Sequence, residues 1–204
     1  IEWRRSLRGQ SRRWAPCPAK QRPLRYASRA RRLPSRQATC CCAGPSCSPL
    51  REPVRLASLM QLPVIFIFTH DSIALGEDGP THQPVEQLAG LRTMPGMHTF
   101  RPADAQECIG SWREALAHDG PSCLVLTRQG IPIHDPAFAD VSKGASILAD
   151  GDRGTIIATG SEVNLAMQAR ELLAKEGVDV RVVSMPCVER FRERFQSSIW
   201  CITY

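Results

Sequence analysis

The stretch that decides the fold is a short apolar run followed by a polar loop: Leu62-Pro-Val-Ile-Phe-Ile-Phe68, then Thr69-His-Asp-Ser-Ile-Ala-Leu-Gly-Glu-Asp-Gly-Pro-Thr-His-Gln-Pro84. The run is apolar at every position from Val64 to Phe68, which is typical of a strand in a parallel sheet covered by helices on both faces. The loop contains two histidines, three carboxylates and two glycines. Since loops at the carboxyl ends of such strands are where α/β sheets bind their ligands, the sequence predicts a ligand site in this loop.

Strand and helix patterns alternate around this stretch. A helix ends near residue 61, and a second begins at Pro84 and continues to about Arg92. Short strands over 98–100 and 123–127 flank a helix over 104–118, in which Asp104 and Glu107 can cap the first turn, with Cys108, Trp112, Ala115 and Leu116 on one face. This order predicts α/β architecture: a parallel sheet flanked by helices, with right-handed crossovers, over residues 51–131.

A second unit follows a linker over residues 132–144. Strands over 145–148 and 155–158 are predicted to form a hairpin around Asp150-Gly-Asp-Arg-Gly154. A helix over 162–175 is expected to turn Leu165, Ala169, Leu172 and Leu173 inward, and a strand over 178–184 comes next. Residues 145–204 are too few for a complete domain, so we expect a truncated α/β unit.

The charge of the chain is segregated. Residues 1–51 contain thirteen Lys/Arg and one acid, whereas residues 52–204 contain thirteen Lys/Arg and nineteen acids. We interpret residues 1–50, which are rich in Arg, Pro and Cys, as disordered or as the translation of a wrong reading frame. The alternatives are a targeting segment, or a basic arm that binds nucleic acid or an acidic partner. The first residue is Ile1 rather than Met, which favours a fragment or a processed product.

The cysteines and the hydropathy pattern indicate a cytoplasmic protein. Five of the nine cysteines fall in the first fifty residues, without a second ligand pair at zinc-site spacing, so we expect no metal site among them. The other four are dispersed, as free thiols in a reducing compartment are. No apolar run approaches the roughly 18 residues that a membrane span needs, so we expect no membrane contact.

The candidate site residues are His70, Asp78, His82 and Arg128. His70 follows one strand and Arg128 follows another, so the two are expected to converge at the carboxyl edge of the sheet. An arginine fork with a histidine suits a sugar phosphate. Asp78 can accept a hydrogen bond from a sugar hydroxyl, and His82 can hydrogen-bond or transfer a proton near neutral pH.

Each of these residues also has a purely structural interpretation. A histidine after a strand is commonly a satisfied loop residue, Asp78-Gly79 is a common turn, and Asp71-Ser72 can cap a short helix. The two histidines with their carboxylates could also bind a metal, although they lack the close spacing of helical metal ligands.

Taken together, the loop resembles the corresponding loop of transketolases. Five segments are similar to sequences of this family. Three lie in or near the loop: His70-Asp-Ser-Ile, Gly76-Glu-Asp-Gly-Pro-Thr-His-Gln-Pro84 and Phe100-Arg-Pro-Ala-Asp104. The other two are Ala158-Thr-Gly-Ser-Glu-Val163 and Arg181-Val-Val-Ser-Met-Pro186. The resemblance covers about residues 51–191, and not 4–50 or about 195–204. It implies a thiamine-diphosphate pyrimidine-binding domain, incomplete at its start, followed by part of the family's C-terminal domain.

The resemblance also implies an activity and roles for the candidate residues. Transketolases use thiamine diphosphate and Mg²⁺ to transfer a two-carbon ketol unit from a ketose phosphate to an aldose phosphate, as homodimers of the pentose phosphate pathway. The matching positions imply that His70 and Arg128 bind the substrate phosphate. They imply that Asp78 recognises a substrate hydroxyl and that the catalytic His82 lies beside the reacting carbons.

The chain departs from the family before Val54. Family members carry there a glutamate that activates the aminopyrimidine ring, together with aromatics that pack on it. Between Trp3 and Arg51 this sequence has no Asp or Glu, and where aromatics are expected it reads Cys40-Cys-Cys-Ala-Gly-Pro-Ser-Cys47. The cofactor-binding residues are therefore unidentified, and we expect this chain alone to be inactive. A stand-alone subunit of a split transketolase is a further alternative, but such a subunit would keep the glutamate.

Overall fold

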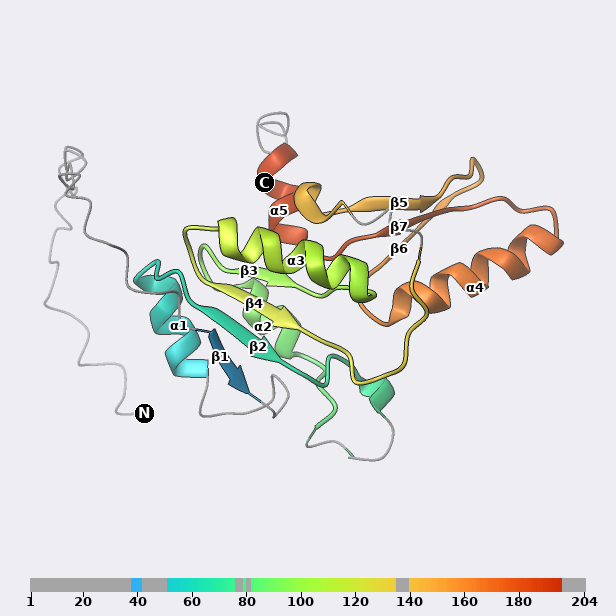
Figure 1. The fold of residues 1–204 in the computed structure, drawn as a ribbon. Coiled ribbons are helices and arrows are strands. Elements are labelled where there is room, and N and C mark those ends of the chain that lie inside the picture. Colours follow the sequence, from blue (N-terminus) through green and yellow to red (C-terminus); the bar gives the residue numbers. More distant parts are fainter. Residues whose placement is uncertain (1–37, 42–50, 76–78, 80–81, 135–139, 196–204) are drawn as a thin grey trace, which may run out of the picture. The chain divides into compact units, whose positions relative to one another are not determined.

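The structure is a computed structural model that describes residues 38–41, 51–75, 79, 82–134 and 140–195 (Figure 1). These residues all belong to one compact unit, Ser35–Tyr204, and the other unit, Ile1–Pro34, lies outside the described residues. Most of the segment 1–50 is therefore outside them as well. Among the described helices, none is both long and apolar enough to cross a membrane.

The first sheet has four parallel strands in the order β1-β2-β4-β3. The strands are β1 (Ala38–Cys41), β2 (Ile65–Phe68), β3 (His98–Phe100) and β4 (Ser122–Val125). Helix α1 (Arg51–Leu59) precedes β2, the short helices η2 (Ile73–Leu75) and α2 (Gln87–Arg92) lie between β2 and β3, and α3 (Ala105–Ala117) lies between β3 and β4. The predicted parallel α/β sheet is confirmed; α2 begins three residues later than expected.

Strand β1 differs from the expectation for residues 1–50. It pairs with β2 in parallel, from Ala38 opposite Ile65 to Cys41 opposite Phe68. A disordered or wrongly translated segment would leave this edge of the sheet unpaired. Pairing uses only backbone N–H and C=O groups, so a four-residue segment can occupy the edge without the side chains of the family.

Strands β2 and β4 of the first sheet are mainly apolar because both of their faces are covered. Phe66 and Phe68 of β2 and Cys123 and Val125 of β4 pack with Val54 of α1 and with α2 on one face. On the other face, Ile65, Phe100 and Leu124 pack with α3, with Val141 and with Cys187. Successive residues of a strand point to opposite faces, so β2 and β4 contribute apolar side chains to both halves of the core, whereas the buried β3 also carries His98 and Thr99.

Helix α3 has the predicted cap and most of the predicted inward face: Ala115 is buried and Trp112 packs against the core, but Leu116 does not. The Asp104 carboxylate accepts from the Glu107 N–H at 2.9 Å, and the Glu107 carboxylate accepts from the Ala103 N–H at 2.7 Å. These bonds set the rotation of the helix, so Glu107, Ser111 and Ala115 are buried, whereas Leu116 is 49% exposed. Burial raises the pKa of Glu107, although hydrogen bonds from Ser184 and Ala103 oppose the shift.

The second sheet has three strands in the order β5-β7-β6: β5 (Ser146–Ala149), β6 (Thr155–Ala158) and β7 (Arg181–Ser184). The predicted hairpin between β5 and β6 is wrong, because β7 lies between them. It pairs parallel with β6 and antiparallel with β5. A parallel β6–β7 pair needs a crossover, and helix α4 (Glu162–Lys175) supplies it.

The predicted inward face of α4 is wrong at Leu165 and Leu172, whereas Ala169 and Leu173 are half-buried. Val163 and Ala166 are buried, whereas Leu165 and Leu172 are 64% and 63% exposed. Val163 packs with Leu148 and Ala103. The short helix η4 (Val141–Lys143) lies within the predicted linker, and α5 (Val188–Phe195) closes the described part of the chain.

Arg101, which follows β3, joins the two sheets. Its guanidinium contacts the Asp71 carboxylate at 2.8 Å and the Glu162 carboxylate at 2.5 Å, and it donates to the Thr159 carbonyl at 3.0 Å. The contact is close, since a Cβ on Gly160 would lie 2.5 Å from Arg101 Nε, and Gly160 has a φ of +60° that other residues rarely adopt. Asp71 follows β2 of the first sheet, and Thr159 and Glu162 lie at the start of α4, which packs on the second sheet. Arg101 therefore holds the two sheets together.

Substituting Arg101→Met is expected to destabilise the chain by roughly 3 kcal/mol, because it leaves the Asp71 carboxylate, which is 2% exposed, without its cation. Urea unfolding followed by circular dichroism measures the loss. Arg181→Met is the matched control, because its ion pair with Asp150 lies at the surface and should contribute less than about 1 kcal/mol. Equal losses in the two variants would show that Arg101 does not join the units.

Substituting Asp104→Ala is expected to cost about 1–2 kcal/mol, because the side chain caps α3 and also accepts from the His134 N–H at 2.7 Å. Asp119→Ala, at the other end of the same helix, serves as the control and should change the free energy of unfolding by less than about 0.5 kcal/mol. The cap would be unimportant if the two variants unfolded at the same urea concentration.

Candidate functional site

The loop after β2 brings His70 and His82 together. Their ring centroids lie 5.9 Å apart, with the rings tilted by 56°. His70 has a φ of +65°, and its Nδ1 lies 2.7 Å from Thr69 Oγ1. Since few non-glycine residues adopt a positive φ, this backbone conformation fixes the direction in which the imidazole leaves the strand. At the other end of the loop, the His82 N–H donates to the Gly79 carbonyl at 3.1 Å, and Gly79 has a φ of +72°.

The loop after β4 lies beside this loop. The Leu126 N–H donates to the Phe68 carbonyl at 2.8 Å, just past the last paired residues of β2 and β4. Further out, the Gln129 amide donates to the Ala74 carbonyl at 3.1 Å. Arg128, one residue earlier, is exposed. The loops that carry His70 and Arg128 therefore converge at the carboxyl edge of the sheet, as expected for adjacent parallel strands.

The structure places three of the four candidate residues. His70 is half-buried, whereas His82 and Arg128 are exposed. Asp78 lies outside the described residues. Imidazole N–H groups and a guanidinium are donors to phosphate oxygens. This edge of the sheet can therefore bind an anionic ligand.

Sequence reasoning missed the role of Asp71. This carboxylate belongs to the polar loop and neighbours His70, but it is 2% exposed and is bound by Arg101. Burial by itself would lower the pKa of Arg101, but its bonds to Glu162 and Asp71 prevail and the pKa lies above its ordinary value. The sequence feature that could have indicated this ion pair is the Phe100-Arg-Pro segment, because it places an arginine immediately after a buried strand.

The residues of this edge do not fit thiamine diphosphate. A carboxylate must face the aminopyrimidine ring, and Asp71 is committed to Arg101. The sequence that precedes α1 contains no acid between Trp3 and Arg51. Within the described ranges, no group of three or more His, Cys, Asp or Glu side chains could hold a metal ion. We therefore derive no reaction step through this cofactor or its Mg²⁺.

Two of the described cysteines have raised thiol pKa values. Cys108 and Cys187 are free thiols. Burial, with the nearby Asp104 carboxylate, raises the pKa of Cys108. Burial together with the charge of Glu189 also raises the pKa of Cys187. Since the thiolate is the reactive form, the raised pKa values disfavour Cys108 and Cys187 as nucleophiles.

Two sequence models of known families match the chain. The model described as "Transketolase, pyrimidine binding domain" matches residues 50–133, and "Transketolase-like TK C-terminal domain" matches residues 144–199. The second match continues past Phe191, where the resemblance was expected to fade. The first region contains β2, β3 and β4 of the first sheet, and the second region contains the whole second sheet.

Known proteins give the same result. The transketolase of Halalkalibacterium halodurans is 55% identical over 150 residues, which cover 70% of this chain and 22% of that protein. The structure of Pichia stipitis transketolase in complex with sedoheptulose-7-phosphate has a TM-score of 0.69 and 39% identity, covering 76% of this chain and 23% of that one. A structure described as "Split gene transketolase, inactive beta4 tetramer" has a TM-score of 0.65 and 28% identity, and the match covers 78% of this chain and 52% of that one.

The chain spans about a fifth of the length of the curated relatives that it matches. Its two matched regions, its parallel first sheet and the loop that carries His70 and His82 agree on one assignment. The chain belongs to the transketolase family.

Proposed function

We propose that this chain is a fragment of a transketolase that keeps a sugar-phosphate-binding edge and, by itself, does not transfer ketol units. The family reaction moves a two-carbon ketol unit between a ketose phosphate and an aldose phosphate. The observation that carries the proposal is the pair His70 and His82, 5.9 Å apart, in a loop adjacent to the one that carries Arg128.

The phosphate is assigned to His70 and Arg128. A guanidinium offers two parallel N–H donors to a phosphate, and an adjacent imidazole adds a third. Asp78 is assigned to a sugar hydroxyl, and His82 to the carbons of the sugar. Structures of family members with sugar phosphates support this assignment, since one of them is a complex with sedoheptulose-7-phosphate.

The proposed loss of activity follows from a missing carboxylate. The sequence before α1 has no Asp or Glu between Trp3 and Arg51, where the family resemblance implies the glutamate that activates the pyrimidine ring. A homodimer, which the family implies, would not repair the site, because each copy lacks the same carboxylate. A cytoplasmic location belongs to this proposal, as its substrates and free thiols suit that compartment.

Two other functions remain distinguishable. A split-transketolase subunit would regain activity when mixed with a separate diphosphate-binding chain; the similar split-gene structure is itself described as inactive. The missing carboxylate predicts that this chain would not. A basic arm within residues 1–50 would bind nucleic acid with an affinity that falls steeply as salt rises.

Titration with sedoheptulose-7-phosphate, followed by calorimetry, is expected to show weak saturable binding. Arg128→Met should weaken it about tenfold, the equivalent of 1.4 kcal/mol, because a charged phosphate contact is lost. Arg153→Met is the matched control, since this exposed arginine lies in the turn between β5 and β6. It should leave the affinity unchanged.

Two results would contradict the proposal. The phosphate assignment fails if the chain does not bind the sugar, or if Arg128→Met and Arg153→Met behave alike. The claim of inactivity fails if the purified chain, given thiamine diphosphate and Mg²⁺, transfers a ketol unit between two sugar phosphates. The two halves of the proposal are thus tested separately.

A further inference from the structure

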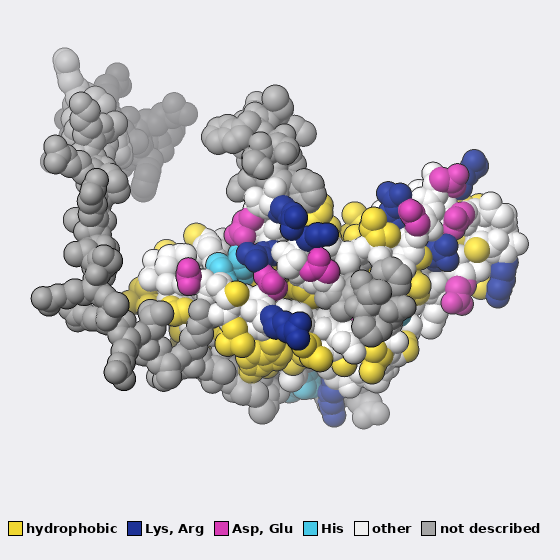
Figure 2. All heavy atoms as spheres, turned by 45° about the horizontal axis from the view of Figure 1, so that its top comes forward, with side chains coloured by type: hydrophobic (Ala, Val, Ile, Leu, Met, Phe, Trp, Pro, Cys, Tyr) yellow, Lys and Arg dark blue, Asp and Glu magenta, His cyan; other side chains and the backbone are white. Residues whose placement is uncertain are grey.

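Arg101 ends a strand of the first sheet but is held by the residues around the second. The charged side chains that Figure 2 presents lie at the surface with both signs mixed, whereas the Arg101 side chain is 5% exposed. The Arg101 N–H donates to the Pro186 carbonyl at 2.8 Å, and the Arg101 carbonyl accepts from the Gly160 N–H at 3.1 Å. Residues 144–195, here called the C-terminal region, therefore fix the Arg101 backbone.

The guanidinium of Arg101 divides its donors between the two sheets. Its Nε donates to the Asp71 carboxylate at 2.9 Å. Its Nη1 lies 2.5 Å from the Glu162 carboxylate and donates to the Thr159 carbonyl at 3.0 Å. The fit is tight, because a Cβ on Gly160 would lie 2.5 Å from Arg101 Nε. Since a guanidinium is a rigid planar group, the start of α4 sets the position of the donors that bind Asp71.

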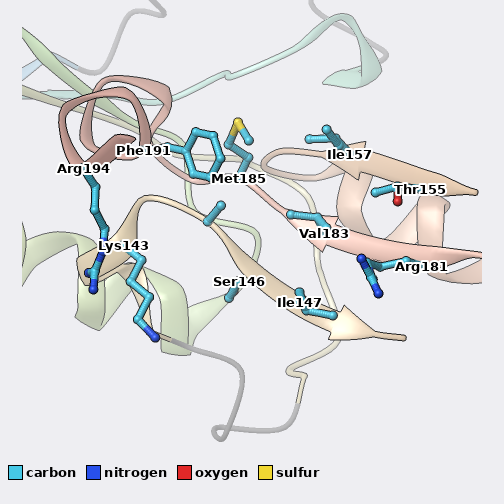
Figure 3. Close-up of a pocket in the computed structure, with 11 residues that line it drawn as sticks. Lys143, Ser146, Ile147, Thr155, Ile157, Arg181, Val183, Met185, Phe191 and Arg194 are labelled. Carbon is cyan, nitrogen blue, oxygen red and sulfur yellow. The ribbon is translucent and has the colours of Figure 1, made fainter. Parts of the chain in front are cut away.

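The contact with Arg101 is separate from the groove of the second sheet. This groove, of about 340 Å³, is lined by side chains that include Ile147, Ile157 and Val183 (Figure 3). Neither Gly160 nor Glu162 is among its lining residues. A substitution at the start of α4 therefore changes the contact with Arg101 without altering the lining of the groove.

His70 has a backbone conformation that needs support from its neighbours. Its φ is +65°, in the left-handed region that residues with a side chain rarely adopt. Such conformations persist when the surrounding contacts impose them. The next residue makes such a contact, because the Asp71 carboxylate, which is 2% exposed, is bound by Arg101 in a buried ion pair. In this conformation the ring centroid of His70 lies 5.9 Å from that of His82.

We propose that the C-terminal region positions His70 for the phosphate through Arg101 and Asp71. Arg101 is a positioning residue: it binds the carboxylate next to His70 and so holds the backbone from which the imidazole extends. When the start of α4 no longer holds Arg101, Asp71 is released and His70 returns to a negative φ. Its ring then leaves the phosphate site that it forms with Arg128. This inference rests on the proposed function, because it explains how that phosphate site is kept in place.

Two substitutions at the start of α4 test the proposal and leave the phosphate site itself unchanged. Gly160→Ala places a Cβ against Arg101 Nε, and Glu162→Ala removes the carboxylate beside Nη1. Gly177→Ala is the control for the first, since Gly177 also has a positive φ, +78° against +60°. Among the described residues, no atom beyond its chain neighbours lies within 4 Å of its Cβ position. Glu171→Ala, at an exposed position of α4, is the control for the second.

Nuclear magnetic resonance of the histidine rings measures the position of His70. The chain has five histidines, so the ring signals are few, and His70→Gln identifies the signal of this residue. A nuclear Overhauser contact between the rings of His70 and His82 reports their separation. The stacked rings of His98 and His118, 3.6 Å apart, are the internal control for an intact fold. Calorimetry on the same samples measures the affinity for sedoheptulose-7-phosphate.

In Gly160→Ala and Glu162→Ala we expect loss of the contact between the rings of His70 and His82. We also expect the affinity for the sugar phosphate to fall about fivefold. Gly177→Ala and Glu171→Ala should retain both the contact and the affinity. If Gly160→Ala does not fold, Glu162→Ala decides the result.

A purely structural role of Arg101 predicts a different outcome. The variants would then unfold at lower urea concentration, but the folded chain would keep the ring contact and the affinity, and this result would overturn the proposal. Failure of the unsubstituted chain to bind the sugar phosphate would contradict the proposed function instead. The ring contact between His70 and His82 would still test the positioning of His70 in that case.

Discussion

The structure depends on one buried charge. Arg101 leaves the end of β3 with 5% of its side chain exposed and contacts Asp71, Glu162 and the Thr159 carbonyl. A guanidinium in such a place is tolerated only when its donors are satisfied and an opposite charge is close. The fold meets this condition with a carboxylate from the loop after β2 and another from the first turn of α4. The contacts that satisfy the donors of Arg101 therefore also hold the two sheets together.

This arrangement also explains what the candidate site can and cannot do. Asp71 is the neighbour of His70 in the sequence. The bond between its carboxylate and Arg101 therefore restrains the start of the polar loop. The carboxylate is then unavailable to a ligand. Among the described residues, the edge of the sheet has two imidazoles and a guanidinium, which suit an anion, and the carboxylate of Asp71 is paired with Arg101. We therefore propose that substrate recognition and cofactor activation are separable in this chain.

Local patterns predicted the first sheet well, because each of its signals is short in range. The apolar run before His70, the Asp104 cap and the order of strands and helices required no knowledge of distant contacts. The second sheet was predicted poorly for the opposite reason. A turn such as Asp150–Gly154 favours a hairpin locally, but the crossover through α4 inserts β7 between β5 and β6. Leu165 and Leu172 point outward because the sheet covers the other face of α4, and helical periodicity alone cannot identify which face is covered.

In the site, His70 and Arg128 could be placed from strand order. The Asp71–Arg101 pair could not, because no spacing rule joins residues thirty positions apart.

The central claim is that the chain retains the substrate side of a transketolase site without the groups that hold its cofactor. A calorimetric titration of the purified chain with thiamine diphosphate in the presence of Mg²⁺ tests this claim most directly. We expect no saturable heat at millimolar cofactor, since Asp71 is paired with Arg101 and the sequence between Trp3 and Arg51 contains no acid. Saturable binding with a dissociation constant in the micromolar range, which corresponds to a binding free energy of about −8 kcal/mol, would contradict the account. It would require cofactor-binding groups that we have not identified.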